Sequence, residues 1–222
     1  MEILTWPGDR VQTRQEDYLL IQPLIQPAIS DADILFFDLE TQHLFQEVGG
    51  YFPERLRLAC GVVYSTRCQR FEDYLEPQAA ELVERLRNAD LVVGFNLLAF
   101  DYRVLAPYAG EGSLSPPTLD ILREVQVQLG HRLSLAALAL ATLGRGKTAD
   151  GVQSVQWFRQ GKLDLVLEYC RADVAVTRDL FEYGWQHGYL LFPDRVTGQR
   201  RQVETPWGTN PLLRRLWERA TA

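Results

Sequence analysis

The sequence has few cysteines and no long apolar segment. Its only three cysteines, Cys60, Cys68 and Cys170, form no CxxC pair, which excludes a disulfide framework and a cysteine metal cluster and favours a reduced, cytoplasmic setting. Apolar runs such as Ile34–Phe37 are too short to span a bilayer. Met1–Leu4 lack the basic and apolar pattern of a signal peptide. We therefore expect no association with a membrane.

The chain also lacks the basic balance typical of nucleic-acid-binding proteins, because its net charge is −6. A cluster of carboxylates that binds metal ions would account for part of this charge. Residues 195–222 are the exception, with six arginines and two acids. This segment either contacts phosphates, with Trp207 or Trp217 stacking on a base, or forms a final helix that packs on the domain and is solvated by its arginines.

Patterns of apolar residues and turn signals predict a mixture of strands and helices. The predicted strands are Ile34–Leu39, a hairpin of Arg57–Tyr64 and Arg70–Leu75, Leu91–Phe95 and the short Thr118–Leu122, with Tyr189–Phe192 and Gln199–Thr205 as edge strands. The predicted helices are Ala79–Asn88, one that starts in Phe100–Tyr108, Leu135–Leu143 after the N-cap Ser134, and Leu163–Trp185. Residues 145–151 are predicted to form a loop. This order favours a mixed sheet with helices on both faces.

Asp38 and Glu40 lie at the end of the apolar strand Ile34–Leu39. Residues two apart on a strand point to the same side of a sheet, so these two like charges need a counter-charge. A divalent cation supplies one, because hard cations prefer carboxylate oxygen. The alternative is a strand end at which both acids reach solvent.

Two later segments each place an acid beside another polar side chain. Asn96 follows the predicted strand Leu91–Phe95, and Asp101 comes five residues later at the start of a helix, where the helix dipole alone favours an acid. Tyr169 and Asp173 are four residues apart and share one helix face. Taken alone, each pattern is typical of ordinary structure: a turn residue, a helix-capping acid, or a buried tyrosine with an exposed acid.

Together, and in this order, the three segments resemble the motifs of the DEDD superfamily of 3′–5′ exonucleases, the DnaQ-like group within the ribonuclease H-like fold. Asp38 and Glu40 match the first motif, Asn96 and Asp101 the second, and Tyr169 and Asp173 the third. A tyrosine four residues before the last aspartate is typical of the DEDDy branch, which includes the proofreading domains of family B DNA polymerases. Residues 38–50 are also similar to bacterial predicted exonucleases. The resemblance covers about residues 32–185.

The resemblance implies an α/β fold, a ribonuclease H-like mixed five-stranded sheet flanked by helices. It implies that two divalent cations, Mg²⁺ or Mn²⁺, are held by Asp38, Glu40, Asp101 and Asp173, and that Tyr169 orients the attacking water. The candidates for contact with the substrate are Thr41, Gln42, Asn96, Phe100 and Lys147. For Asn96 the alternative role is to fix the loop before Asp101. The rest of a P-loop is absent around Lys147, which excludes nucleoside triphosphate hydrolysis.

The expected organisation is an N-terminal extension (1–31) that packs on the domain, a ribonuclease H-like exonuclease domain (32–193) and an arginine-rich C-terminal extension (194–222). The expected substrate is single-stranded DNA, or RNA, with a free 3′ end, from which nucleoside 5′-monophosphates are released. A helicase, polymerase or other repair protein is a candidate partner. The alternatives are a non-catalytic nucleic-acid-binding or scaffolding domain and a structure-selective endonuclease on the same fold.

Overall fold

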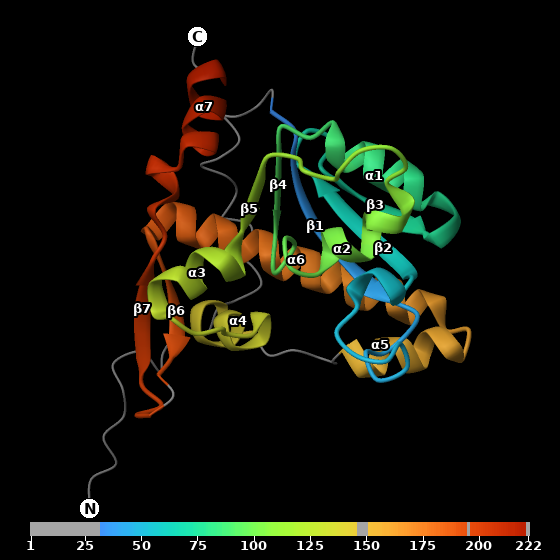
Figure 1. The fold of residues 1–222 in the computed structure, drawn as a ribbon. Coiled ribbons are helices and arrows are strands. Elements are labelled where there is room, and N and C mark those ends of the chain that lie inside the picture. The colour runs from blue at the N-terminus through green and yellow to red at the C-terminus, as the bar shows by residue number, and fades with distance from the viewer. Residues whose placement is uncertain (1–31, 146–150, 195, 221–222) are drawn as a thin grey trace, which may run out of the picture.

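The protein is described by a computed structural model that covers residues 32–145, 151–194 and 196–220. Its centre is a five-stranded sheet (Figure 1). The strands are β1 (Ile34–Thr41), β2 (Leu58–Ser65), β3 (Arg70–Leu75), β4 (Leu91–Gly94) and β5 (Thr118–Asp120). They lie in the order β3-β2-β1-β4-β5, with β1, β4 and β5 parallel and the β1–β2 and β2–β3 pairs antiparallel. The predicted mixed five-stranded sheet is therefore confirmed.

Helices cover both faces of this sheet. The α-helices of the described residues are α1 (Ala79–Arg87), α2 (Asp101–Leu105), α3 (Ile121–Leu129), α4 (Leu135–Leu143), α5 (Gly151–Arg159), α6 (Leu163–His187) and α7 (Pro211–Ala220). Short 3₁₀ turns are η1 (Pro53–Arg55), η2 (Glu76–Gln78), η3 (Ala106–Tyr108) and η4 (Pro206–Thr209). Within the described ranges, no helix combines the length and the apolarity needed to cross a membrane.

The period-two alternation of β1 divides the core into two clusters. Ile34 and Phe36 pack in the cluster to which α6 contributes, whereas Leu35 and Phe37 pack in the cluster of α1 and α2. Because β1 is paired on both sides, these side chains are almost completely buried. The same alternation sends residues 38 and 40 toward the α6 face.

Most predicted elements are present, and three predictions need correction. The strand predicted for Thr118–Leu122 ends at Asp120, because the Asp120 carboxylate accepts a hydrogen bond from the backbone N–H of Arg123 (3.3 Å) and caps α3. Helix α5 was not predicted and begins at Gly151, the last residue of the expected loop. The two predicted edge strands, β6 (Tyr189–Pro193) and β7 (Arg200–Glu204), pair only with each other in a separate hairpin.

The C-terminal segment packs against α6. Trp207 is fully buried, and its ring stacks on that of Phe181 with centroids 5.0 Å apart. Leu213 and Leu216 of α7 are buried in the same cluster. Stacking of Trp207 on a base is therefore wrong, and the packed-helix alternative describes this segment.

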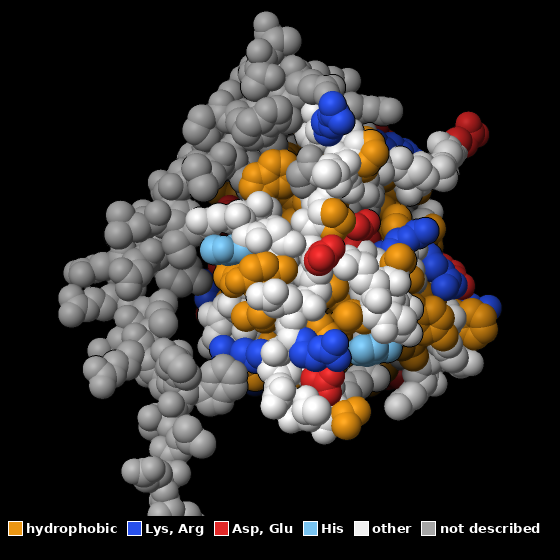
Figure 2. All heavy atoms as spheres, turned by 90° about the vertical axis from the view of Figure 1, so that its left-hand side faces the viewer, with side chains coloured by type: hydrophobic (Ala, Val, Ile, Leu, Met, Phe, Trp, Pro, Cys, Tyr) orange, Lys and Arg blue, Asp and Glu red, His pale blue; other side chains and the backbone are white. Residues whose placement is uncertain are grey.

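The described part of the face that Figure 2 shows carries no continuous basic surface. On the described part of this face, Lys and Arg side chains are interspersed with hydrophobic and acidic ones. Arg201 pairs with Asp194 (3.1 Å) within the hairpin. This arrangement fits solvation of a packed segment better than a single phosphate-binding path.

Gly184 is required for the close approach of Trp207 to α6. A Cβ atom at this position would lie 2.3 Å from Cζ3 of the Trp207 ring. We expect Gly184→Ala to destabilise the fold by about 1–3 kcal/mol through overpacking, measured by urea unfolding. Gly151→Ala is the control, because a Cβ there meets no atom within 4 Å. The cost of Gly184→Ala should shrink in a Trp207→Leu background, and an unchanged cost would contradict this cause.

Candidate active site

Three acids from two distant segments meet at the C-terminal end of β1. One carboxylate oxygen from each of Asp38, Glu40 and Asp173 lies within 4.8 Å of the others. The alternation of β1 points Asp38 and Glu40 toward α6, and Asp173 of α6 lies beside them. The pairing of β1 with β2 shifts between Glu40 and Thr41, so a bulge lies beside the cluster. The structure thus brings together three of the four predicted metal-binding acids.

Asp101 lies next to this cluster but outside the group of three. It is the first residue of α2 and is only 2% exposed. Burial, followed by the charge of Asp38, raises the pKa of the Asp101 carboxyl. Burial and the charge of Asp38 also raise the pKa of Glu40. The charge of Asp38 therefore raises the pKa of both Glu40 and Asp101.

The loop that carries the chain from β4 to Asp101 is held by Asp120. The Asp120 carboxylate accepts hydrogen bonds from the backbone N–H groups of Asn96 (2.8 Å) and Leu98 (3.1 Å). Asn96 has a positive φ of 76°, and its side-chain oxygen accepts a hydrogen bond from Arg132 (2.9 Å). These contacts assign Asn96 the alternative role of fixing the loop before Asp101. Asp120, at the end of β5, thus holds the loop that leads to Asp101.

The acids open into a cleft of about 360 Å³. Its walls come from the end of β1, the following loop, Phe100, the start of α5, and α6. The lining residues are Asp38, Leu39, Glu40, Thr41, His43, Leu44, Phe45, Leu56, Phe100, Gly151, Val152, Tyr169 and Asp173. Thr41, Phe100 and Tyr169 are therefore placed where the sequence predicted them, beside the acids.

Gln42 has a different place from the one predicted. Its amide nitrogen donates to the Leu58 carbonyl (2.8 Å) and to the Glu76 carboxylate (2.8 Å), and Gln42 does not line the cleft. Glu76 also binds Arg57 and Tyr108, and the hydrogen bond from Arg57 is the largest cause that lowers its pKa to about 2. Gln42 fastens the end of β1 to this network, and its contact with a nucleotide stays a prediction.

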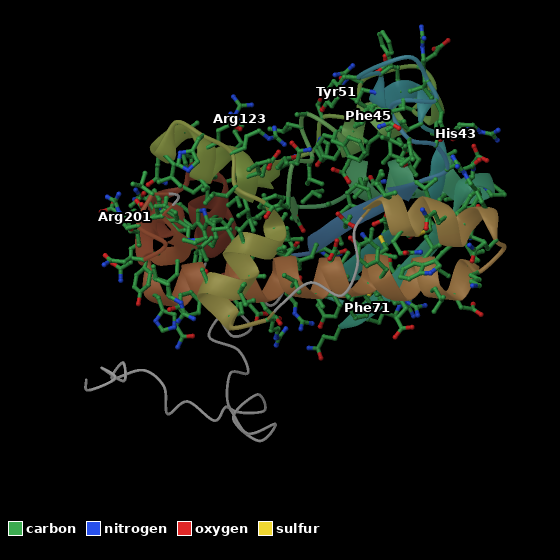
Figure 3. All side chains as sticks on the ribbon, turned by 90° about the horizontal axis from the view of Figure 1, so that it is seen from below. His43, Phe45, Tyr51, Phe71, Arg123 and Arg201 are labelled. Carbon is green, nitrogen blue, oxygen red and sulfur yellow. The ribbon has the colours of Figure 1, made fainter. Side chains whose placement is uncertain are left out.

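Lys147 lies outside the described residues. The arginine-rich segment is described in part and is remote from the cleft. Figure 3 shows Arg201 at one end of the molecule, and His43, Phe45 and Tyr51 at the other. Contact of this segment with the upstream strand stays a prediction that its position does not favour.

Sequence reasoning missed α5 and the neutral groups packed under the acids. α5 packs on α6 and β1, and its Trp157 meets the Tyr169 ring edge-on at 6.3 Å. Behind the acids, the Cys170 thiol donates to the carbonyl oxygen of Asp38 (3.4 Å). The three-residue spacing of Val152, Val155 and Phe158 was the available signal for α5.

The cluster has the chemistry of a metal site. Its donors are all carboxylate oxygens, as hard divalent cations prefer. Glu40 and Asp173 are largely buried, so their charges repel one another where water screens them poorly. A bound cation would remove that repulsion, and Asp38, Glu40 and Asp173 are the residues that would hold it.

Comparisons with known proteins agree with this fold. The family model described as RNase_H superfamily matches residues 35–185, and the chain belongs to the RNase H superfamily. No curated protein matches the sequence significantly. Among 76 matching chains of solved structures is the family B DNA polymerase from the hyperthermophilic archaeon Pyrobaculum calidifontis. Its TM-score is 0.54 at 17% identity, over 69% of this chain and 24% of the polymerase chain, so the likeness is one of fold.

The raised pKa values of Glu40 and Asp101 predict that metal binding depends on pH. Their pKa is higher in the folded protein than in the unfolded chain, where it is about 4. The metal-free melting temperature should therefore fall as pH rises from about 4 toward the folded pKa values. Mn²⁺ must displace the bound protons, so its stabilising effect should grow between about pH 5.5 and pH 8.

Melting curves with and without Mn²⁺ at both pH values test this. Saturation at a hundred times Kd corresponds to about 2.7 kcal/mol of stabilisation in the wild type. Glu40→Gln should raise the metal-free melting temperature at pH 8 and lose most of the Mn²⁺ effect. Glu168→Gln, which removes an exposed acid of α6, is the matched control. An equal Mn²⁺ effect in Glu40→Gln and wild type would remove Glu40 from the metal site.

Proposed function

We propose that this protein is a metal-dependent 3′–5′ exonuclease of the DEDDy type. It hydrolyses the terminal phosphodiester bond of single-stranded DNA, or of RNA, and releases nucleoside 5′-monophosphates. The observation that carries the proposal is the convergence of Asp38, Glu40 and Asp173 in one cleft, with Tyr169 beside them, at the end of a ribonuclease H-like sheet.

The side chains divide the work by their chemistry. Asp38, Glu40 and Asp173 would hold a divalent cation, and Asp101, which adjoins Asp38, would complete the ligand set for a second. When bound, Mg²⁺ or Mn²⁺ ions supply positive charge for the scissile phosphate and a more acidic water. The charge of Asp38 acts on both Glu40 and Asp101, so a bound cation would offset repulsion that reaches all three carboxylates.

Tyr169 would position the attacking water. It lies one helical turn before Asp173, lines the cleft and is 5% exposed, and its ring is packed against Trp157. An unperturbed phenol has a pKa of about 10, so it is a poor base near neutral pH. Its hydroxyl can still hold a water by a hydrogen bond in a fixed direction, which favours the transition state over the ground state.

Removal of that hydroxyl separates positioning from metal binding. Tyr169→Phe keeps the packing against Trp157, and we expect kcat to fall by roughly 10- to 1000-fold, the loss of one well-placed hydrogen bond. The stabilisation by Mn²⁺ should stay as in the wild type, since the acids are unchanged. A variant with the wild-type rate across the pH range would exclude Tyr169 from the reaction.

End-labelled strands test the activity itself. With Mn²⁺, a 5′-labelled single-stranded oligonucleotide should be shortened one nucleotide at a time, whereas a 3′-labelled one should lose its label as a mononucleotide at once. Asp38→Asn should abolish both results. A circular single strand should stay intact, and its cleavage would show an endonuclease. Binding of strands without hydrolysis under any metal condition would contradict the exonuclease and favour a non-catalytic domain.

A further inference from the structure

Two aromatic side chains outside the predicted motifs lead from the acid cleft to the surface. Phe45 lines the cleft, and its ring lies 6.0 Å from that of Phe100 on one side and 4.7 Å from that of Tyr51 on the other. Tyr51 is 53% exposed. Figure 3 shows Tyr51 and Phe45 close together. The three rings therefore form a row that starts beside the acids and ends in solvent.

The loop that carries Phe45 and Tyr51 is held in place. Gly49 and Gly50 have positive φ values of 85° and 138°, and the N–H of Gly50 donates to the carbonyl of Phe45 (3.0 Å), which turns Tyr51 back over Phe45. The Tyr51 hydroxyl donates to the carbonyl of Ala99 (3.0 Å), just before Asp101. The loop begins at the strand end that carries the acids, so the rings are positioned relative to them.

A cation lies at the outer end of the row. The guanidinium carbon of Arg103 lies 5.5 Å from the centre of the Tyr51 ring, while its side chain, 43% exposed, pairs with Glu54 (2.9 Å). Single exposed aromatic residues are common on proteins and need no explanation. Here the exposed ring continues a row of rings from an acid cleft and has a guanidinium beside it. Aromatic faces with neighbouring cations are how proteins bind unpaired bases without a sequence preference.

We infer that Tyr51 and Phe45 form a stacking site for unpaired bases upstream of the terminal nucleotide, with Arg103 next to the strand's phosphate backbone. This rests on the proposed function and narrows its substrate to strands whose last few bases are unpaired, because a paired base cannot offer its face to Tyr51. The site serves binding of the strand and takes no part in the chemical step. It also places the upstream strand along the loop after β1, at the opposite end of the molecule from Arg201 (Figure 3).

Tyr51→Ala tests this inference by comparing a long and a short substrate. One is a single-stranded oligonucleotide and the other is the p-nitrophenyl ester of thymidine 5′-monophosphate, which has no upstream base. We expect the ratio of kcat/KM for the oligonucleotide to that for the ester to fall by about 5- to 100-fold, through KM, as for one lost stacking contact. Tyr51→Phe, which keeps the ring, should restore the ratio.

Phe71→Ala is the matched control, because Phe71 is an exposed aromatic residue on β3, away from Phe45 and Tyr51 (Figure 3). Abasic nucleotides at the second and third positions from the 3′ end should weaken the wild type as Tyr51→Ala does. They should add little in the Tyr51→Ala protein. An abasic effect of equal size in both proteins would overturn the stacking assignment.

A binding measurement separates this inference from the proposed function. A 2-aminopurine base near the 3′ end should be quenched on binding to the wild type and to Tyr51→Phe, but not to Tyr51→Ala. Quenching without hydrolysis would retain the stacking site and reject the exonuclease. Hydrolysis with unchanged KM, Kd and quenching in Tyr51→Ala would retain the exonuclease and reject the stacking site.

Discussion

The repulsion between carboxylates at the end of β1 is the constraint on which the rest of the site depends. Asp38 and Glu40 are fixed on a strand that is paired on both sides, and Asp173 is fixed on a helix packed across it. None of them can swing far into solvent without disturbing a buried element. The electrostatic repulsion between these carboxylates is reduced by proton uptake in the metal-free protein, as the raised pKa of Glu40 indicates. A bound cation would reduce it as well. Rigid neutral packing around the acids thus creates the demand for positive charge that a metal site needs.

α6 is the element that supplies this rigidity. Tyr169 and Asp173 of α6 face the cleft, and the residue after each of them, Cys170 and Val174, is fully buried in the core. Its second half is held by a different set of contacts, since the C-terminal segment packs on it through Trp207. Both halves of the helix are therefore fixed by packing. The arginine-rich C-terminal segment stabilises the site indirectly, because it packs on the helix that carries Tyr169 and Asp173.

The elements that the sequence predicted well are those in which burial and periodicity coincide. β1, the β2–β3 hairpin and α6 have a clear period and a buried face. The resemblance to the DEDD motifs, and not the pattern of any one element, predicted that Asp38, Glu40 and Asp173 meet. α3, which was not predicted, begins with Ile121 and Leu122, and these two residues continue the apolar run of the short β5. The boundary between strand and helix is set by the side-chain cap from Asp120 and not by a change in the apolar pattern. The sequence could not predict the contacts of Gln42 or decide between the two roles expected for Asn96, because these depend on Glu76 and Arg132, whose positions only the folded chain defines. The pairing of β6 with β7, rather than with the main sheet, likewise depends on tertiary packing that the local sequence does not show.

The hydrogen bonds that Asp120 accepts from the loop before Asp101 also bear on the order in which the chain folds. Asp120 reaches that loop only after β5 has paired with β4, and both are parallel strands joined by long connections. The antiparallel β1–β2–β3 meander is more local and can form earlier, when Asp101 and Asp173 are still distant from Asp38. We therefore expect the acids to crowd together late, after the main barrier to folding has been crossed. A metal ion that relieves this crowding acts mainly on the unfolding rate, so it prolongs the lifetime of the folded protein and leaves the speed of folding nearly unchanged.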